Sequence, residues 1–149
     1  MPNVSVTSEI QAPVADVWEV LADFPNVADW NGGVKKSYAT GEQTEGVGAS
    51  RHCDLAPAGT LEETIREWHP NEGMVVSIDS STKSPLKQGL ASIELKAGAA
   101  GSTAVAVNVD YDLKWGPFGK LFGSVVHRQL TKGFEGLLRD LDTAASSKV

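Results

Sequence analysis

The sequence predicts an α+β fold in which a curved antiparallel sheet of about seven strands wraps around a long C-terminal helix. One observation behind this prediction is an apolar stripe of helical period near the C-terminus. A second is the central region, where strand-like segments alternate with turns, and a third is an N-terminal strand followed by one or two short helices. A sheet of this size must twist, and its concave face can then bury the stripe of a long helix.

The N-terminal region predicts a strand and then helical structure. Residues 3–10 alternate between apolar and polar side chains, which is typical of a half-buried strand. Residues 14–23 follow a proline and carry apolar side chains at helical spacing, so we expect a helix there. Residues 24–30 allow one more short helical turn before the break at Asn31-Gly32-Gly33.

The central region, from residue 34 to residue 114, has the pattern of strands separated by glycine or proline turns. The clearest segment is the last, where every second residue from Val105 to Leu113 is apolar or aromatic. One face of that strand should therefore be buried and the other exposed. We expect six strands here, near residues 34–41, 48–55, 60–69, 73–81, 88–97 and 103–114.

The stretch from Pro117 to about Ala145 predicts the long helix. A proline suits the first helical position, and a helix of this span would be roughly 43 Å long. Its internal glycines each cost about 1 kcal/mol relative to alanine, so packing against the sheet must stabilise it. The apolar stripe consists of Phe118, Phe122, Val126, Leu130, Phe134, Leu137, Leu138 and Leu141.

Composition and charge narrow the functional classes. The 149 residues make a single domain, 1–149, with a net charge of −6 and dispersed basic residues. We therefore expect neither nucleic-acid binding nor stable membrane insertion. Cys53 is the only cysteine, which excludes an internal disulfide, and no metal-ligand spacing occurs. We expect no cofactor and no metal, a cytoplasmic location because no signal core is present, and a monomer or homodimer.

Several short motifs, taken in order, resemble one family. They are Ala12-Pro13-Val14-Ala15-Asp16-Val17-Trp18, Trp30, Gly46-Val47-Gly48-Ala49-Ser50-Arg51, Gly59-Thr60-Leu61-Glu62-Glu63-Thr64-Ile65, Trp68-His69-Pro70, Gly101-Ser102-Thr103 and Gly116-Pro117-Phe118-Gly119. The chain thus resembles the helix-grip (SRPBCC) superfamily of START lipid-transfer domains and pathogenesis-related allergens, and in particular its polyketide cyclase/dehydrase-like branch. The resemblance covers nearly the whole chain and implies a cavity for a small hydrophobic molecule.

Two positions depart from the pattern of that branch. Thr64 stands in place of a frequent arginine, and His69 stands in place of a frequent aspartate before Pro70. The resemblance therefore assigns no ligand role to these two positions. A lipocalin-like barrel is the rival fold, but it would lack the helix after the first strand.

A predicted hairpin around residues 56–58 brings two charged residues together. Its register places Arg51 opposite Glu63 and Cys53 opposite Leu61. The strand pattern then puts Arg51 and Glu63 on the inner, mostly apolar face. Such a pair is either a structural ion pair or a group that orients the polar end of a ligand or polarises its carbonyl oxygen.

Other titratable residues are candidates for proton transfer. Glu67 should share the inner face with Glu63 and could act as a base, and His127 on the long helix could carry a proton near neutral pH. The catalytic candidates are therefore Arg51, Glu63 and His127. The pattern points His52 outward, so it is a weaker candidate.

The sequence leaves three functions open. The first, which it favours, is binding or carriage of a small hydrophobic molecule between the sheet and the C-terminal helix. The second is a cofactor-independent cyclase or dehydratase acting on a carbonyl-bearing aromatic or polyketide substrate. The third is an interaction module whose interior is filled with side chains. The expected ligand-binding residues are Trp30, Tyr38, Arg51, Glu63, Met74, Val76, Ile78, Val109, Tyr111, Phe122, Val126 and Leu130.

Overall fold

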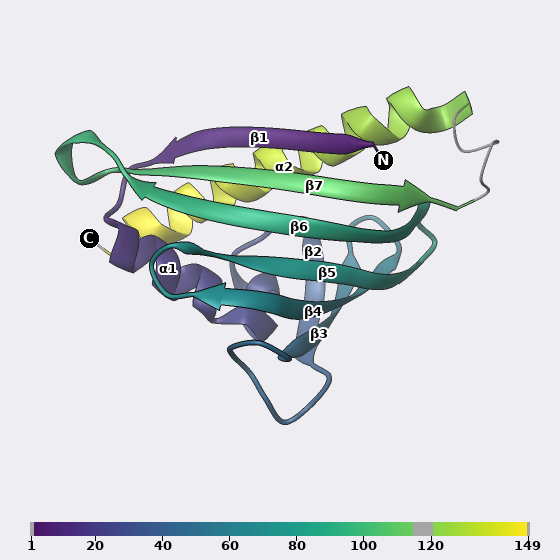
Figure 1. The fold of residues 1–149 in the computed structure, drawn as a ribbon, viewed down its shortest axis with the longest axis horizontal. Helices are drawn as coiled ribbons and strands as arrows, with labels where there is room; N and C mark the ends of the chain where they lie inside the picture. Colours follow the sequence, from purple (N-terminus) through teal and green to yellow (C-terminus); the bar gives the residue numbers. More distant parts are fainter. Residues whose placement is uncertain (1, 115–120, 149) are drawn as a thin grey trace.

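The computed structural model describes residues 2–114 and 121–148, which form a sheet with two α-helices and short 3₁₀ segments (Figure 1). The α+β class and the predicted order of elements are confirmed. In chain order the elements are β1 (Asn3–Ile10), α1 (Val14–Ala22), η1 (Phe24–Asp29), β2 (Val34–Ala39), β3 (Ser50–Leu55), β4 (Thr60–His69), β5 (Gly73–Thr82), β6 (Leu86–Ala97), η2 (Ala99–Gly101), β7 (Thr103–Leu113) and α2 (Gly123–Ser146).

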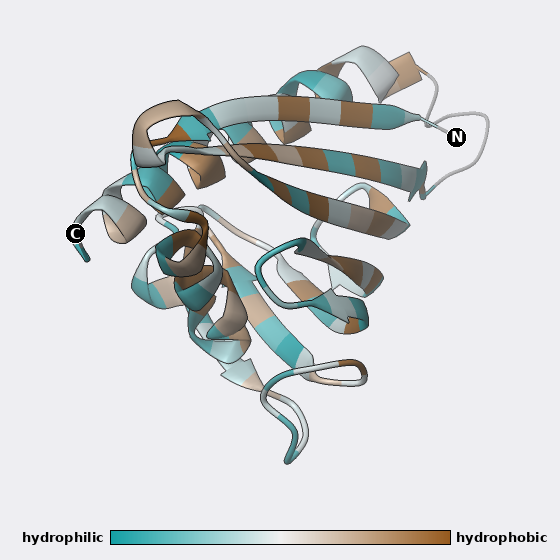
Figure 2. Cartoon of the chain, turned by 60° about the vertical axis from the view of Figure 1, so that its left-hand side comes forward, coloured by the Kyte–Doolittle hydropathy of each residue, from teal (hydrophilic) through white to brown (hydrophobic). Residues whose placement is uncertain are grey.

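The seven strands form one antiparallel sheet in the order β1-β7-β6-β5-β4-β3-β2. The first strand therefore pairs with the last, and the hairpins between them extend the sheet one strand at a time. Hydrophobic and hydrophilic bands alternate along the strands (Figure 2), as a sheet with one buried face requires. On β7 the alternating residues Val105, Val107, Val109 and Tyr111 are all almost fully buried, as predicted.

The register of the β3–β4 hairpin is the one predicted from the sequence. Arg51 lies opposite Glu63, and Cys53 lies opposite Leu61. Cys53 and Ile65 are fully buried, which confirms that this set of alternating residues faces the core.

A bulge in β4 overturns the prediction for Glu67. The pairing of β4 with β5 shifts between Ile65 and Glu67, so one extra residue enters the strand and the alternation reverses. Trp68 then packs into the core against Trp18, with ring centroids 4.8 Å apart. Glu67 is exposed, its side chain hydrogen-bonded to His69, and it does not share the inner face with Glu63.

Helix α2 runs behind the sheet from the end where β1 begins to the end where α1 lies (Figure 1). Its main contacts are with β1 and α1. It begins at Gly123 and spans 24 residues, about 36 Å at the standard rise. The predicted start at Pro117 lies outside the described residues.

The C-terminal half of α2 is the firmly held part of the helix. Leu138, Leu141 and Ala145 are buried. The carboxylate of Asp140 accepts a hydrogen bond from the backbone N–H of Gly32 at 2.9 Å, and Asp142 accepts one from Gln11 at 2.8 Å.

The N-terminal half of α2 is packed much more loosely. Only Val126 is buried there, while Leu121 and Phe122, just before the helix, and Val125 are exposed. Leu130 and Phe134 contact the core but stay partly exposed. The two halves of this helix therefore differ in how strongly burial holds them to the sheet.

Candidate functional site

A small cavity lies where helix α2, the α1–η1 segment and the middle of the sheet face one another. Its volume is about 30 Å³, which is enough for a water molecule and far below the several hundred Å³ of a ligand-filled pocket. Its lining comes from every layer of the fold and is mostly apolar: Leu21, Asp23, Phe24, Val27, Trp30, Arg51, Met74, Val76, Ile93 and Leu137.

Arg51 is the basic residue of this lining, and its charge is already compensated. Its Nε donates a hydrogen bond of 3.0 Å to Oε1 of Glu63, and Nη1 donates one of 2.8 Å to the carbonyl oxygen of Phe24. The guanidinium also lies over the Phe24 ring, 3.8 Å from its centroid. The side chains of Arg51 and Glu63 are only 15% and 11% exposed. The pair therefore joins β3, β4 and η1 and adds no net charge to the interior.

Cys53 completes this cluster. Its thiol is buried and donates to Oε1 of Glu63 over 3.4 Å. Burial raises the pKa of the Cys53 thiol to about 12, with the nearby Glu63 carboxylate acting in the same direction. The thiol is therefore protonated at physiological pH and is a core residue, as expected from the sequence, rather than a nucleophile.

Trp30, one of the lining residues, carries a buried polar group that lacks a partner. It follows η1 and packs against the core. Among the buried side-chain nitrogens and oxygens of the described residues, Trp30 Nε1 is the one without a hydrogen-bond partner. A buried donor left unsatisfied costs roughly 1–3 kcal/mol, so an acceptor that reached this N–H would be favoured.

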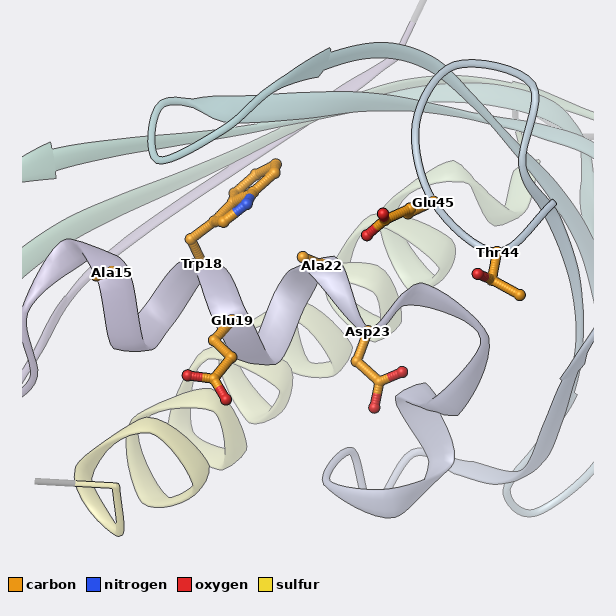
Figure 3. Close-up of a pocket in the computed structure, with 7 residues that line it drawn as sticks. All are labelled: Ala15, Trp18, Glu19, Ala22, Asp23, Thr44 and Glu45. Atoms are coloured by element: carbon orange, nitrogen blue, oxygen red, sulfur yellow. The ribbon is translucent and has the colours of Figure 1, made fainter.

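A larger groove lies between α1 and the loop that joins β2 and β3 (Figure 3). Its volume is about 420 Å³, and it is lined by Ala15, Trp18, Glu19, Ala22, Asp23, Thr44 and Glu45. Thr44 and Glu45 belong to the loop that joins β2 and β3. Asp23, directly after α1, lines both the groove and the cavity.

The expected ligand-binding residues divide into two groups. Trp30, Arg51, Met74 and Val76 line the cavity together, and Glu63 contacts it through Arg51. The expected ligand-binding residues that are buried or partly buried but do not line the cavity belong to the surrounding core. Burial raises the pKa of one of them, Tyr111. These core residues are Ile78, Val109, Tyr111, Val126 and Leu130.

Three candidates face away from the cavity. Tyr38 is stacked on His52, and its position on β2 puts it on the outer face with His52. Phe122 is 58% exposed because it precedes the first turn of α2, where little covers the helix. His127 is exposed one residue beyond the buried Val126, so it borders the apolar stripe instead of pointing inward.

His52 lies outward, as predicted, between two carboxylates. Its ring nitrogens contact Glu62 and Asp54, and hydrogen bonds to these two residues raise the pKa of His52 despite the opposing effect of burial. The described residues include no cluster of three or more potential metal ligands. The described helices include none that is both long and apolar enough to cross a bilayer.

Sequence reasoning missed several cavity residues, chiefly those of the α1–η1 segment: Leu21, Phe24 and Val27. Phe24 was hard to predict because both its contacts with Arg51 bridge residues far apart in the chain. The helical spacing of Leu21 with Trp18 was the available signal, and it indicated burial without indicating a site.

The arrangement is that of a helix-grip protein, in which a curved sheet, a long C-terminal helix and a short N-terminal helix enclose an apolar interior with few polar groups. Comparison with known proteins identifies the family. Residues 1–146 match the family "Polyketide cyclase / dehydrase and lipid transport", and the chain belongs to it. No curated protein matches the sequence significantly.

Solved structures share the fold along nearly the whole chain. A START superfamily protein from Mycobacterium smegmatis has a TM-score of 0.82 at 16% identity, with 99% of each chain covered. XoxI from Bacillus cereus has a TM-score of 0.79 at 18% identity, covering 97% of this chain and 95% of its own. Ara h 8.0201 has a TM-score of 0.78 at 14% identity, with 98% of each chain covered. At these identities the likeness concerns the fold alone.

Proposed function

We propose that this protein binds and carries a small hydrophobic molecule in the interior between the sheet and α2. The observation that carries the proposal is the buried, unpaired N–H of Trp30, a residue of the mostly apolar lining. A site of this kind, mostly apolar with a few polar groups that orient the ligand, is typical of small-molecule binding. Membership of a family that includes lipid transport supports the same function.

The cavity must widen to admit such a molecule, since its present volume is about 30 Å³. The loose N-terminal half of α2, which leads up to the lining residue Leu137, is the part that can move at least cost. Leu130 and Phe134 are only partly buried, so separating them from the sheet exposes less apolar surface than moving Leu138 or Leu141 would. The hydrogen bonds to Asp140 and Asp142 hold the other half in place during this motion.

Carriage is favoured over catalysis by the arrangement of titratable groups. Arg51 and Glu63 neutralise each other, while Glu67 and His127 are exposed. An acid and a base that converge on one point of a substrate are therefore missing from the described part of the chain.

A second candidate function has one observation in its favour. An interior of only about 30 Å³ is also expected of an interaction module whose core is filled with side chains. Such a protein would act through its surface and would not take up a small molecule.

Titration with Nile red, a neutral dye that fluoresces in apolar surroundings, distinguishes the two functions. The informative variant is Leu137→Trp, which adds bulk to the cavity lining from a partly buried position on α2. Leu121→Trp is the matched control, because Leu121 is 75% exposed just before the same helix.

The carrier predicts saturable binding at one site per chain, unchanged in Leu121→Trp and weakened at least about tenfold in Leu137→Trp. Thermal unfolding of each variant confirms that it is folded. No saturable binding by the folded wild-type protein, of Nile red or of a panel of fatty acids, polyphenols and quinones, would refute the carrier and favour the filled interaction module.

A further inference from the structure

The polar groups of the interior specify what kind of molecule fits there. Resting on the proposed function, we infer that the ligand is an uncharged apolar molecule with a carbonyl-type oxygen that accepts a hydrogen bond from Trp30 Nε1. The geometry assigns Trp30, rather than the charged Arg51, as the residue that recognises the polar end.

The first argument concerns the donors that remain free. Nε of Arg51 donates to Glu63, Nη1 donates to the carbonyl oxygen of Phe24, and the guanidinium face is covered by the Phe24 ring. An anionic ligand at Arg51 would lie beside the Glu63 carboxylate that already neutralises it, so the buried cluster would carry an excess negative charge. The N–H of Trp30, a residue of the same lining, is buried and unpaired. An indole N–H donates and cannot accept, so its partner must be an acceptor.

The second argument concerns the charges beside the cavity. The groove that shares Asp23 with the cavity also carries Glu19 and Glu45 in its lining (Figure 3). The Nζ of Lys148 lies 3.1 Å from Glu19 and compensates that carboxylate. The described ion pairs include none with Asp23 or Glu45. A carboxylate ligand would therefore approach like charges, on a chain whose net charge is −6, whereas a neutral molecule would not be repelled.

The third argument concerns the size of the cavity. A volume of about 30 Å³ beside the Trp30 ring can hold one water molecule. Trp30 Nε1 itself is buried and unpaired, so this water does not reach it. A ligand that widens the cavity and brings an oxygen to the N–H removes the cost of the unpaired donor, whereas a pure hydrocarbon leaves it unpaired. The site therefore distinguishes ketones, aldehydes and esters from hydrocarbons of the same shape.

Three naphthalenes of similar shape test this inference: 2-acetylnaphthalene, 2-ethylnaphthalene and 2-naphthoate. Their binding is followed by NMR of the indole N–H groups, since the chain has four tryptophans and hence four indole signals. Trp30→Phe removes one donor while keeping an aromatic ring, and it assigns the Trp30 signal. Trp68→Phe is the matched control, because Trp68 packs on Trp18 in the core and is not part of the cavity lining.

The expected result has three parts. The ketone shifts the Trp30 indole signal downfield and binds about tenfold more weakly to Trp30→Phe, whereas the hydrocarbon binds both proteins alike. Trp68→Phe binds all three compounds like the wild-type protein. At about pH 8, where its carboxyl group is ionised, the naphthoate binds at least about tenfold more weakly than the ketone.

The outcomes separate this inference from the proposed function. If the ketone and the hydrocarbon both bind, and Trp30→Phe weakens their binding equally or not at all, the inference is wrong and the proposed carrier function stands. Tightest binding of the naphthoate would likewise overturn the inference alone. If none of the compounds in this or the earlier panel binds, both fail. Should Trp30→Phe not fold, the Trp30 signal can be assigned from the other three Trp→Phe variants. A downfield shift of this signal with the ketone but not with the hydrocarbon then supports the inference, and equal responses overturn it.

Discussion

Replacing Arg51 with alanine should destabilise the protein strongly, because it leaves a buried carboxylate without its partner. The substitution removes the 3.0 Å bond to Glu63, the 2.8 Å bond to the Phe24 carbonyl and the contact with the Phe24 ring. Glu63, with a side chain 11% exposed, then keeps only the weak thiol donor of Cys53. Breaking a buried ion pair in this way costs about 3 kcal/mol or more.

This cost can be measured by urea unfolding and by thermal unfolding. For a domain of this length a loss of 3 kcal/mol corresponds to a fall of about 6–12 °C in Tm. The matched control is Arg66→Ala, since Arg66 pairs with Asp79 on the outer face and its side chain is 54% exposed. An exposed pair contributes at most about 1 kcal/mol, so this control should change the free energy of unfolding little.

A double variant tests the physical explanation. In Arg51→Met with Glu63→Leu, no charge is left buried, so most of the stability lost in Arg51→Ala should return. The reasoning would be refuted if Arg51→Ala and Arg66→Ala lost the same small amount. It would also be refuted if the double variant were less stable than Arg51→Ala.

Two further predictions follow from the shifted pKa values. Glu62 and then Asp54 raise the pKa of His52 above 6.5, so His52 stabilises the fold fully below about pH 6.5 and this contribution fades as pH rises through the folded-state pKa. His52→Gln should therefore cost more stability at about pH 5.5 than at about pH 9, and an equal cost at both would contradict this. The pKa of Cys53 is raised to about 12, so iodoacetamide at about pH 8 should label it only after unfolding, and rapid labelling of the native protein would show that the thiol is accessible.

The β3–β4 hairpin shows how far local patterns reach. Its register follows from a short turn and from strict alternation, and both are properties of neighbouring residues. The prediction that Arg51 meets Glu63 was therefore confirmed, and with it the inward position of Cys53. Glu67, four residues further on, was placed wrongly because the bulge after Ile65 depends on how β4 pairs with β5.

Helix α2 shows a second limit of sequence patterns. The apolar stripe correctly predicted a long helix with one inward face, but it gave no reason to separate the two halves. Residues of the same stripe range from buried Leu138 and Leu141 to exposed Phe122, because the C-terminal half lies against α1 and β1 whereas the start of the helix has little to cover it.

The sequence by itself determined the fold class, the order of the elements and the face of each regular strand. These depend on periodicity, which neighbouring residues express directly. Only the tertiary structure decided which residues share the cavity. Phe24, Trp30 and Arg51 come from separate segments, and packing, not spacing, brings them together. The unpaired N–H of Trp30 is likewise a property of the folded chain, because an unfolded indole is hydrogen-bonded to water and becomes selective only when burial removes that water.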